Sequence, residues 1–327
     1  MLLITGGLGF IGGNLISHIL EEHDDEIINI DSCTYASNQN FQKKFLQNSK
    51  YKFLKIDIFN QSSVKEVFKN YNPSAIIHLA AESHVDNSIK EPLKFLNTNI
   101  IGTFNLLEES RKYVERCGLN NFRFIHVSTD EVFGSLGKKE KPFSEKNKYL
   151  PNSPYSASKA SSDHLVRAYY KTYGLNCIIT NCSNNYGPFQ HTEKLIPKVI
   201  TNALKGLPIP IYGNGDQIRD WLYVKDHCTA LMQALCKGIP GETYNIGGNN
   251  EIKNLTTVEK ICEVLSELKP ANNCSYFDLI EFVKDRPGHD NRYAIDSRKA
   301  KNELKWQPAE TFESGIHKTV SWYLQNQ

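Results

Sequence analysis

The chain has 327 residues, of which 40% are hydrophobic and 23% are charged, as is usual for globular proteins. Its net charge of +2 gives no field that would argue for a nucleic-acid partner or a membrane surface. No stretch approaches the roughly 20 apolar residues of a membrane span, and the start lacks the charged region of a signal peptide. The eight cysteines show no zinc-ligand spacing, so we expect reduced thiols, no metal and a cytoplasmic protein.

Short apolar runs alternate with stretches of helical spacing over the first 181 residues, a pattern typical of βαβ units. The expected strands are Leu2–Thr5, Ile27–Ile30, Tyr51–Lys55, Ala75–Leu79, Phe122–Val127 and Asn176–Asn181. The expected helices are Gly12–Glu21, Ser62–Tyr71, Pro92–Cys117 and Pro154–Tyr173. Residues 1–181 are therefore predicted to form an α/β domain, a Rossmann-type doubly wound parallel sheet that binds NAD.

The pattern changes after the sixth expected strand, where segments become shorter and richer in proline and glycine. Residues 182–327 are predicted to form mainly a smaller α/β domain for the substrate. It would pack on the carboxyl edge of the sheet, where ligands of such folds bind. Stretches near 221–238 and 291–297 are expected to return to the first domain, which makes the boundary discontinuous.

A glycine motif joins the first expected strand to the first expected helix. Gly6, Gly9 and Gly12 permit a tight turn and the close approach of a pyrophosphate to a helix N-terminus. Asp31 ends the second strand, where a carboxylate hydrogen-bonds the ribose 2′-hydroxyl and repels a 2′-phosphate. The pattern favours NAD over NADP; a structural turn and a solvated loop aspartate are the alternatives. Further contacts to the adenine are expected from Asp57 and Ile58.

Tyr155 and Lys159 are four residues apart in an expected helix that Ser153 can cap, so they lie on one face. An ammonium beside a phenol stabilises the phenolate and lowers its pKa, which makes tyrosine usable as a base. A surface pair is the alternative for such a motif. Because a dinucleotide-binding half precedes it, the catalytic interpretation is favoured.

Two adjacent carboxylates, Asp130 and Glu131, follow the expected strand Phe122–Val127 at the edge where catalytic groups gather. Neighbouring carboxylates at a buried strand end repel each other and are costly to bury unless they are used. If their pKa values are separated, one can act as an acid and the other as a base. The alternative for Asp130 is a cap of the following turn.

The chain resembles the extended short-chain dehydrogenases/reductases in the glycine motif and in Thr129 with Tyr155 and Lys159. Within that family the finer similarity is to bacterial-type dTDP-glucose 4,6-dehydratases, and it extends nearly end to end. The resembling stretches are residues 80–86 (AAESHVD), 128–131 (STDE), 153–159 (SPYSASK), 181–188 (NCSNNYGP), 193–197 (EKLIP), 216–221 (DQIRDW), 244–248 (YNIGG) and 285–290 (DRPGHD).

This resemblance implies NAD-dependent dehydration of a nucleotide-linked glucose, with dTDP-glucose favoured, on the way to a deoxysugar. Tyr155, beside Lys159 and Thr129, would remove the 4-hydroxyl proton while C4 passes hydride to NAD. Glu131 would then remove the C5 proton, and Asp130 would protonate the departing 6-hydroxyl. Hydride returns to C6 and Glu131 gives a proton back to C5, which yields a 4-keto-6-deoxy sugar and restores NAD.

The resemblance also implies the binding residues and a homodimer that forms through the helices Pro92–Cys117 and Pro154–Tyr173. The cofactor residues are Gly6, Gly9, Phe10, Ile11, Gly12, Asp31, Asp57, Ile58, Leu79, Ala80, Ala81, Ser83, Asn97, Tyr155, Lys159 and Asn181. The substrate residues are Glu82, Ser83, Thr129, Asn184, Asn185, Glu193, Lys194, Arg219, Asn245, Arg286 and His289. Of these, Arg219 and Arg286 carry fork-shaped donors that suit a diphosphate.

Several alternatives share this scaffold. A UDP-sugar 4,6-dehydratase differs in the nucleotide base, and one methyl group separates thymine from uracil. A nucleotide-sugar 4-epimerase or a decarboxylase does not need Asp130 and Glu131 together. A non-catalytic NAD-binding regulator would have a broken Thr–Tyr–Lys set, which is intact here. The lysine-rich stretch Phe133–Pro151 is expected to be a solvated loop near the mouth of the site.

Overall fold

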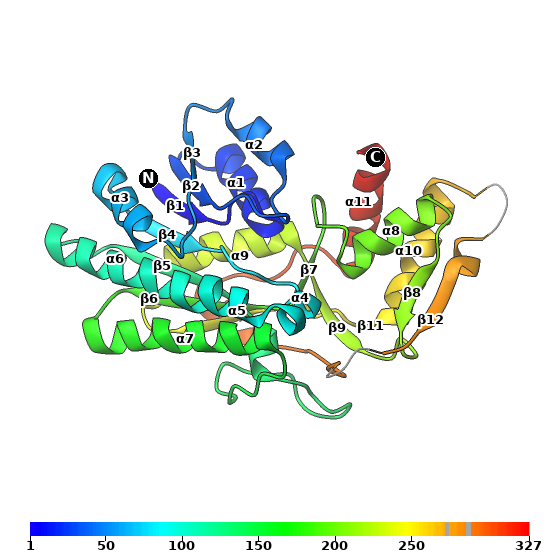
Figure 1. Ribbon diagram of the computed structural model, residues 1–327. Helices are drawn as coiled ribbons and strands as arrows, with labels where there is room; N and C mark the ends of the chain where they lie inside the picture. The colour runs from blue at the N-terminus through cyan, green and yellow to red at the C-terminus, as the bar shows by residue number, and fades with distance from the viewer. Residues whose placement is uncertain (272–274, 286–288, 327) are drawn as a thin grey trace.

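A seven-stranded parallel sheet forms the centre of the larger lobe in the computed structural model, which describes residues 1–271, 275–285 and 289–326 (Figure 1). The strands are β1 (Leu2–Thr5), β2 (Ile27–Asp31), β3 (Tyr51–Lys55), β4 (Ala75–His78), β5 (Arg123–Thr129), β6 (Cys177–Cys182) and β10 (Thr243–Ile246). Their order is β10-β6-β5-β4-β1-β2-β3, which contains the strand order of a doubly wound dinucleotide-binding sheet. The predicted fold class is confirmed.

Helices cover both faces of this sheet. One face carries α1 (Phe10–Glu22), α2 (Gln39–Phe45) and α9 (Val224–Lys237); the other carries α3 (Gln61–Tyr71), α6 (Thr103–Cys117) and α7 (Pro154–Tyr173). Because alternate strand residues point to opposite sides, Leu2 and Ile4 pack on the first face and Leu3 on the second. The continuous apolar runs of the sequence are therefore buried on both sides.

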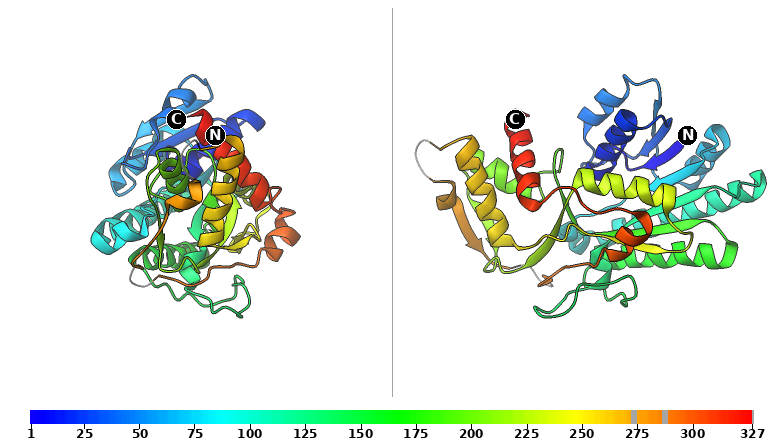
Figure 2. Two further views of the ribbon diagram at one scale, coloured as in Figure 1. Left: turned by 90° about the vertical axis from the view of Figure 1, so that its right-hand side faces the viewer. Right: turned by 180° about the vertical axis from the view of Figure 1, so that it is seen from behind.

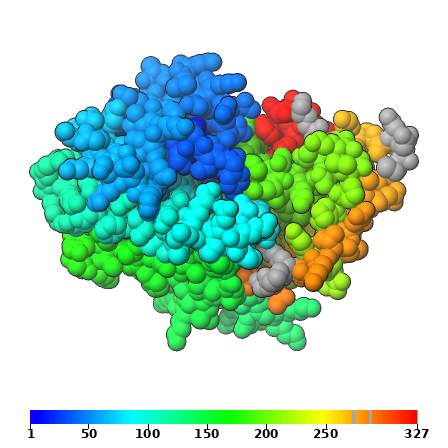
Figure 3. Space-filling view, in the orientation of Figure 1, coloured from blue at the N-terminus to red at the C-terminus, as the bar shows by residue number. Residues whose placement is uncertain are grey.

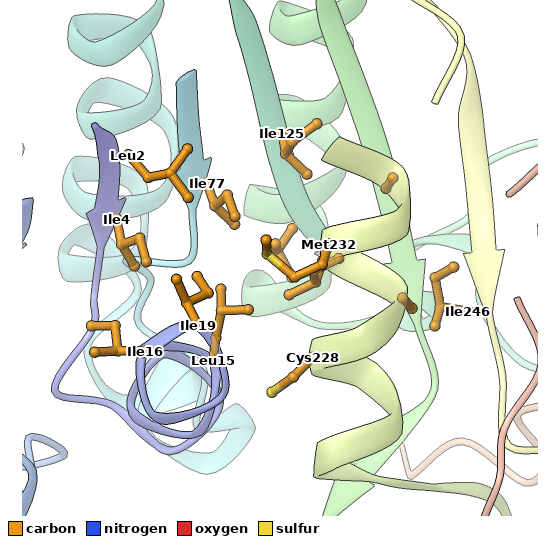
Figure 4. Packing of buried hydrophobic residues seen from close by; sticks show 14 of the residues in the cluster. Leu2, Ile4, Leu15, Ile16, Ile19, Ile77, Ile125, Cys228, Met232 and Ile246 are labelled. Carbon is orange, nitrogen blue, oxygen red and sulfur yellow. The ribbon is translucent and has the colours of Figure 1, made fainter. Parts of the chain in front are cut away.

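The first face is closed by two helices that are far apart in the sequence. Figure 4 shows Leu15 and Ile19 of α1 lying against the sheet, with Cys228 and Met232 of α9 alongside. Burying one such leucine or isoleucine stabilises the fold by about 1.5–3 kcal/mol. The core of the larger lobe thus includes residues well beyond 181.

Strand β10 differs from the expected organisation, in which residues 239–250 belong to the smaller domain. Thr243–Ile246 instead pair in parallel with Ile179–Cys182 of β6, at the edge of the large sheet. All four residues of β10 are buried. A four-residue run of mixed polarity between glycines has no period that could reveal this pairing in advance.

The smaller lobe contains two small sheets and three longer helices. Its strands are β7 (Asn184–Tyr186), β8 (Ile209–Tyr212), β9 (Ile218–Tyr223), β11 (Glu251–Lys253) and β12 (Ile280–Val283). Its helices are α8 (Leu195–Leu204), α10 (Asn254–Leu268) and α11 (Phe312–Gln325), with a 3₁₀ turn η3 (Tyr276–Leu279). Figure 2 shows α11 beside α10, and in Figure 3 the blue and cyan surface of the larger lobe abuts the yellow-green surface of the smaller one.

The expected helix Pro92–Cys117 is interrupted. It follows α4 (Val85–Lys90) and consists of α5 (Pro92–Phe95), a π-helical stretch η1 (Leu96–Gly102) and α6. Inside the π-helical stretch, Asn99 is buried and its carbonyl oxygen accepts hydrogen bonds from the hydroxyls of Thr103 and Ser162, both at 2.6 Å. A widened turn of this kind is typical of functional sites.

The lysine-rich stretch that follows the 3₁₀ turn η2 (Asp130–Phe133) is only partly solvated. Phe133 and Phe143 are buried with Ala294 and Ile295, and Phe143 forms a bridge with Ile295. A second π-helical turn, η4 (Ala300–Leu304), packs against α9. The lysines at 138, 139, 141, 146 and 148 are exposed, and no described residue from 133 to 151 lines the main cavity. Backbone hydrogen bonds from Leu136 to Arg292 at 3.0 Å and from Phe143 to Ala294 at 2.9 Å fasten the stretch to the segment near 291–297. A position of this loop near the mouth of the site stays a prediction.

Candidate active site

A cavity of about 460 Å³ lies at the carboxyl ends of β1 to β6 and extends to the start of α8. Its lining brings together most of the predicted site residues: Gly6, Gly9, Phe10, Ile11, Gly12, Asp31, Asp57, Ile58, Leu79, Ala80, Ala81, Glu82, Ser83, Asn97, Thr129, Asp130, Glu131, Tyr155, Lys159, Asn184, Asn185, Glu193 and Lys194. In doubly wound folds this edge is where ligands bind.

Four predicted residues lie outside the lining, and Arg286 lies outside the described residues. Asn245 is fully buried in β10, where its side-chain amide donates to the carbonyl of Phe143 at 2.9 Å. Asn181 points away from the cavity and donates to the carbonyl of Thr129 at 3.1 Å. The structure thus gives both asparagines a role in holding neighbouring backbone.

Arg219 and His289 are the other two. The guanidinium of Arg219 donates to the carbonyls of Ile218 and Asp290 at 2.8 and 3.0 Å and lies over the ring of Tyr293. Nδ1 of His289 lies 2.6 Å from a carboxylate oxygen of Asp285. These positions are at the border of the two lobes, and contacts of either residue with a sugar nucleotide stay a prediction.

The glycine motif has the geometry of an anion site. Gly6 adopts a φ of +71°, and a Cβ there would lie 2.7 Å from the backbone of Ala80. Gly9 is the N-cap of α1 and offers no side chain, so the first N–H groups of the helix stay available to a ligand. Together with the helix dipole, they favour a pyrophosphate at this turn.

Asp31 lines the cavity, but its carboxylate is already used by the loop that follows β2. One oxygen accepts from the N–H of Leu8 at 3.0 Å; the other accepts from the N–H of Cys33 at 2.8 Å and the hydroxyl of Ser37 at 2.9 Å. This loop adds lining residues that the sequence reasoning missed, among them Ser32 and Thr34. The signal that could have found them is their position directly after a strand of the sheet.

Tyr155 and Lys159 lie buried at the start of α7, as the spacing predicts. Nζ of Lys159 donates to the carbonyl of Val127 at 2.7 Å, and burial lowers the pKa of this ammonium. Burial raises the pKa of Tyr155 well above its ordinary value, and the charge of Glu131 adds to this effect. In the protein alone, burial and the neighbouring carboxylates thus hold the Tyr155 pKa above its ordinary value, opposite to the expected lowering.

Asp130 is buried, whereas Glu131 is partly exposed. Burial raises the pKa of Asp130 well above its usual value, the charges of Glu131 and Asp220 raise it further, and Arg219 opposes them. One oxygen accepts from the hydroxyl of Thr129 at 3.3 Å; the other is buried and has no hydrogen-bond partner among the described residues. A protonated acid at neutral pH fits this environment.

Thr129, rather than Asp130, caps the turn that follows β5. Its hydroxyl accepts from the N–H of Glu131 at 3.3 Å. The alternative interpretation of Asp130 as a turn cap is therefore wrong. The carboxylic acid is left to face the cavity, and Glu131 enters the cavity beside it.

Charged side chains line the far end of the cavity, and one of them, Lys194, joins the smaller lobe to the larger one. Glu82 lies 3.0 Å from Nζ of Lys94, and Lys194 donates to the carbonyl of Ser83 at 3.3 Å. Other lining residues missed from the sequence are Lys94, Thr98, Ser128, Cys182, Ser183, Gln190 and His191. Most of them lie next to a residue that was predicted, and side-chain direction decided which of the neighbours faces the cavity.

Among residues 1–271, 275–285 and 289–326, no group of His, Cys, Asp and Glu is placed to hold a metal ion. Seven cysteines in the same ranges are free thiols, and four of them are buried. Over this part of the chain, we find no helix with the length and apolar character that crossing a membrane requires.

Comparison with known proteins covers both lobes. A family profile described as GDP-mannose 4,6 dehydratase matches residues 3–319. The dTDP-glucose 4,6-dehydratase of Neisseria meningitidis serogroup B is 54% identical over 331 residues, 99% of this chain and 93% of that protein. The crystal structure of the Bacillus anthracis dTDP-glucose 4,6-dehydratase in complex with NAD has a TM-score of 0.88 and 46% identity, covering 99% of this chain and 96% of that one. The crystal structure of the Streptomyces venezuelae dTDP-glucose 4,6-dehydratase, with NAD and TYD bound, has a TM-score of 0.91 and 40% identity, covering 99% of this chain and 97% of that one.

Proposed function

Because the chain belongs to the family described as GDP-mannose 4,6 dehydratase, we propose that it dehydrates dTDP-glucose to dTDP-4-keto-6-deoxyglucose with NAD. The observation that carries this proposal is one cavity that holds Tyr155 and Lys159 together with the carboxyl groups of Asp130 and Glu131. Relatives that are similar over almost their whole length are dTDP-glucose 4,6-dehydratases. The enzyme is a hydro-lyase whose product is a precursor of deoxysugars.

NAD fits the residues at the carboxyl edge of the large sheet. The turn at Gly6 and the uncapped start of α1 suit its pyrophosphate, and Asp31 suits the adenosine ribose. Asp57 and Ile58 line the part of the cavity next to Asp31. When bound, NAD accepts the electron pair taken from C4 and restores it at C6, so the overall reaction has no net redox change.

Tyr155 is the base for the 4-hydroxyl proton. Because burial raises its pKa, the phenolate needs positive charge and a hydrogen bond beside it. Lys159 supplies the charge from the next turn of α7, and the Thr129 hydroxyl interacts with the phenol oxygen. Oxidation at C4 thus depends on all three side chains.

Glu131 and Asp130 divide the elimination of water. A ketone at C4 acidifies the C5 proton, which the partly exposed carboxylate of Glu131 accepts and gives back to C5 when hydride returns to C6. Burial raises the pKa of Asp130, which suits this carboxyl group to hold a proton and donate it to the departing 6-hydroxyl. A 4-epimerase needs neither group, which is why this pair favours dehydration.

These roles are tested by separating the two steps. Asp130→Asn and Glu131→Gln should leave NAD content unchanged and slow elimination about 10²–10⁴-fold, the usual contribution of one acid or base. Oxidation at C4, followed by absorbance at 340 nm in a single turnover, should change by less than about tenfold. Equal loss of both steps would contradict the assignment.

The substrate is tested by comparing kcat/KM for dTDP-glucose and UDP-glucose. One methyl group in an apolar pocket is worth about 1–3 kcal/mol, so we expect a preference of roughly 10–200-fold for dTDP-glucose. Mass spectrometry should show loss of one water from the sugar. A C4-epimer with unchanged mass would refute dehydration, and a UDP-glucose preference would correct the nucleotide.

Three further properties are proposed. Residues 1–181, with returns near 221–238 and 291–297, bind NAD, whereas 182–327 mainly bind the sugar nucleotide. The chain forms a homodimer in the cytoplasm; exposed apolar side chains on α5, η1 and α6 support a helix-mediated interface (Leu93, Leu96, Ile101 and Phe104). Sedimentation equilibrium at micromolar concentration should give twice the monomer mass, and a monomer would refute the dimer.

A further inference from the structure

A buried carboxylate that the mechanism above does not use lies one helical turn beyond Lys159. Asp163 is on the same helix, α7, and has no exposed surface. One of its oxygens lies 3.2 Å from Nε2 of His126, which is equally buried on β5. The other accepts from the hydroxyl of Tyr149 at 2.8 Å and from the amide of Asn181 at 3.3 Å.

Asp163 reaches two catalytic residues through its neighbours. Val127, whose carbonyl receives the Lys159 ammonium at 2.7 Å, follows His126 in β5. The amide of Asn181 that contacts Asp163 also donates to the carbonyl of Thr129 at 3.1 Å. One carboxylate therefore links the helix that carries Lys159 to the strand end that carries Thr129.

The charges around Asp163 identify what balances it. Burial lowers the pKa of His126 to about 4 and that of His78, whose ring lies 5.2 Å from His126, well below its usual value. Both imidazoles are thus neutral at pH 7. The other titratable groups that interact with Asp163 are Lys159, Arg167 and Tyr149, and Cys182 interacts with Lys159.

Burial raises the pKa of Asp163, but the contact with His126 and then the charges of Lys159 and Arg167 lower it below its usual value. Lys159 and Arg167 are the cations that can balance this buried carboxylate, and Arg167 also donates to the Tyr149 hydroxyl at 2.7 Å. Burial favours loss of the proton from Lys159, and the negative charge of Asp163 opposes this loss. Isolated buried charges cost several kcal/mol, so each of the pair depends on the other.

We infer that Asp163 is a positioning residue that keeps Lys159 charged and, through Asn181, keeps Thr129 in place beside Tyr155. The expected effect of Asp163 on turnover rests on the proposed function, whereas its expected effect on the charge of Lys159 does not. The loss of Asp163 should therefore be visible in a property of Lys159 that can be measured without any substrate.

The direct test is the Asp163→Asn variant, which removes the charge and keeps the shape. The Lys159 pKa is measured by NMR on protein with ¹³C-labelled lysine, and a Lys159→Arg sample assigns the resonance. We expect the pKa to fall by at least about one pH unit, a typical effect of losing one nearby opposite charge. Asp226→Asn is the matched control, since this buried carboxylate accepts from the N–H of Glu310 and lies outside the cavity.

Turnover of dTDP-glucose gives the second readout. In Asp163→Asn we expect kcat to fall at least tenfold with KM changed less than about threefold, and the alkaline limb of the kcat profile to move to lower pH. Asp226→Asn should change neither. An unchanged Lys159 pKa, or an effect no larger than in Asp226→Asn, overturns the inference.

The experiment still gives a clear answer if the unaltered chain is inactive or if the Asp163→Asn variant does not fold. If the unaltered chain does not convert dTDP-glucose, the proposed function fails while the lysine titration still decides on Asp163. If Asp163→Asn does not fold, Asn181→Ala tests the link to Thr129. It should lower kcat at least fivefold without moving the Lys159 pKa, and an unchanged kcat overturns the positioning of Thr129.

Discussion

At the scale of single residues, the turn after β1 shows how backbone conformation and ligand approach constrain the same position. Gly6 needs a positive φ and also lies against the backbone of Ala80, so a side chain is excluded twice. Gly118, which ends α6, has nearly the same φ of +63° but nothing within 4 Å of a Cβ. A comparison of these two positions therefore separates the cost of a strained backbone from the cost of a collision between a Cβ and its neighbours.

Gly6→Ala should lose most of its bound NAD and lower the free energy of unfolding by more than about 2 kcal/mol, because strain and collision add. The checks are NAD content after purification and the Tm. Gly118→Ala serves as the control and should cost only about 1 kcal/mol with NAD content unchanged. Similar losses in both variants would show that collision with Ala80 does not matter.

Asp130 makes the stability of the protein depend on pH. Burial disfavours the charged form of this carboxyl group and therefore raises its pKa in the folded state. The folded state binds the proton more tightly than the unfolded state. Its contribution to stability is therefore present below the unfolded pKa and is lost as the pH rises towards the folded pKa.

Asp130→Asn should accordingly raise the Tm by about 2 °C or more at pH 8, and the difference should shrink to nothing near pH 4. Thermal unfolding at several pH values in a buffer without substrate provides the measurement. The variant would then be more stable and less active than the unaltered chain. A Tm difference that does not vary with pH would contradict a buried, protonated Asp130.

At the scale of secondary structure, α7 is the element that the sequence predicts most completely. Ser153 forms a capping box with Ser156, Pro154 occupies the first turn, and Gly174 ends the helix at a φ of +69°. Each end thus carries a local signal. Strand β1 matches its prediction for a related reason, since its apolar run ends at Thr5 and is followed by two glycines.

The parts that could not be predicted depend on contacts between distant segments. In β6, successive side chains point to opposite faces, so Cys182 enters the cavity and Asn181 turns to Asp163. The sequence motif identifies both residues, but it does not reveal which way either side chain points. The π-helical stretch around Asn99 likewise follows from hydrogen bonds to α7, which no local pattern encodes.

Ser153→Ala should lower the free energy of unfolding by about 1 kcal/mol through loss of the cap, and should also reduce kcat, because the first turn of α7 carries Tyr155. Thr311→Ala is a matched control: Thr311 forms the same kind of capping box at the start of α11, away from the cavity. It should show a similar stability loss with kcat unchanged. Urea unfolding and steady-state turnover check both; an equal kcat in the two variants would contradict the link between cap and catalysis.

At the scale of the whole molecule, the two lobes do not correspond to two halves of the chain. Helix α9 and strand β10 belong to the larger lobe, although they follow β7 and α8 of the smaller one. Without them, Leu15 and Ile19 would lose their packing partners and β6 would become an exposed edge. Exposed edges and apolar faces of this kind promote association.

A fragment of residues 1–181 should therefore lack cooperative unfolding, bind the dye ANS and retain less near-UV circular dichroism than the full chain, in spite of its complete glycine motif. Thermal scans of the fragment and the full chain, at equal concentration, make the comparison. A sharp unfolding transition and NAD binding by the fragment would contradict this dependence on α9 and β10.

The late position of β10 also has a consequence for how the protein is made. Residues 182–246 take roughly 3–13 s to synthesise at about 5–20 residues per second. During that interval strands β1 to β6 are already synthesised, whereas α9 and β10, which cover one face and one edge of their sheet, are not yet complete. Production of this chain in cells should therefore respond to the supply of nascent-chain chaperones and to the rate of translation across residues 182–246.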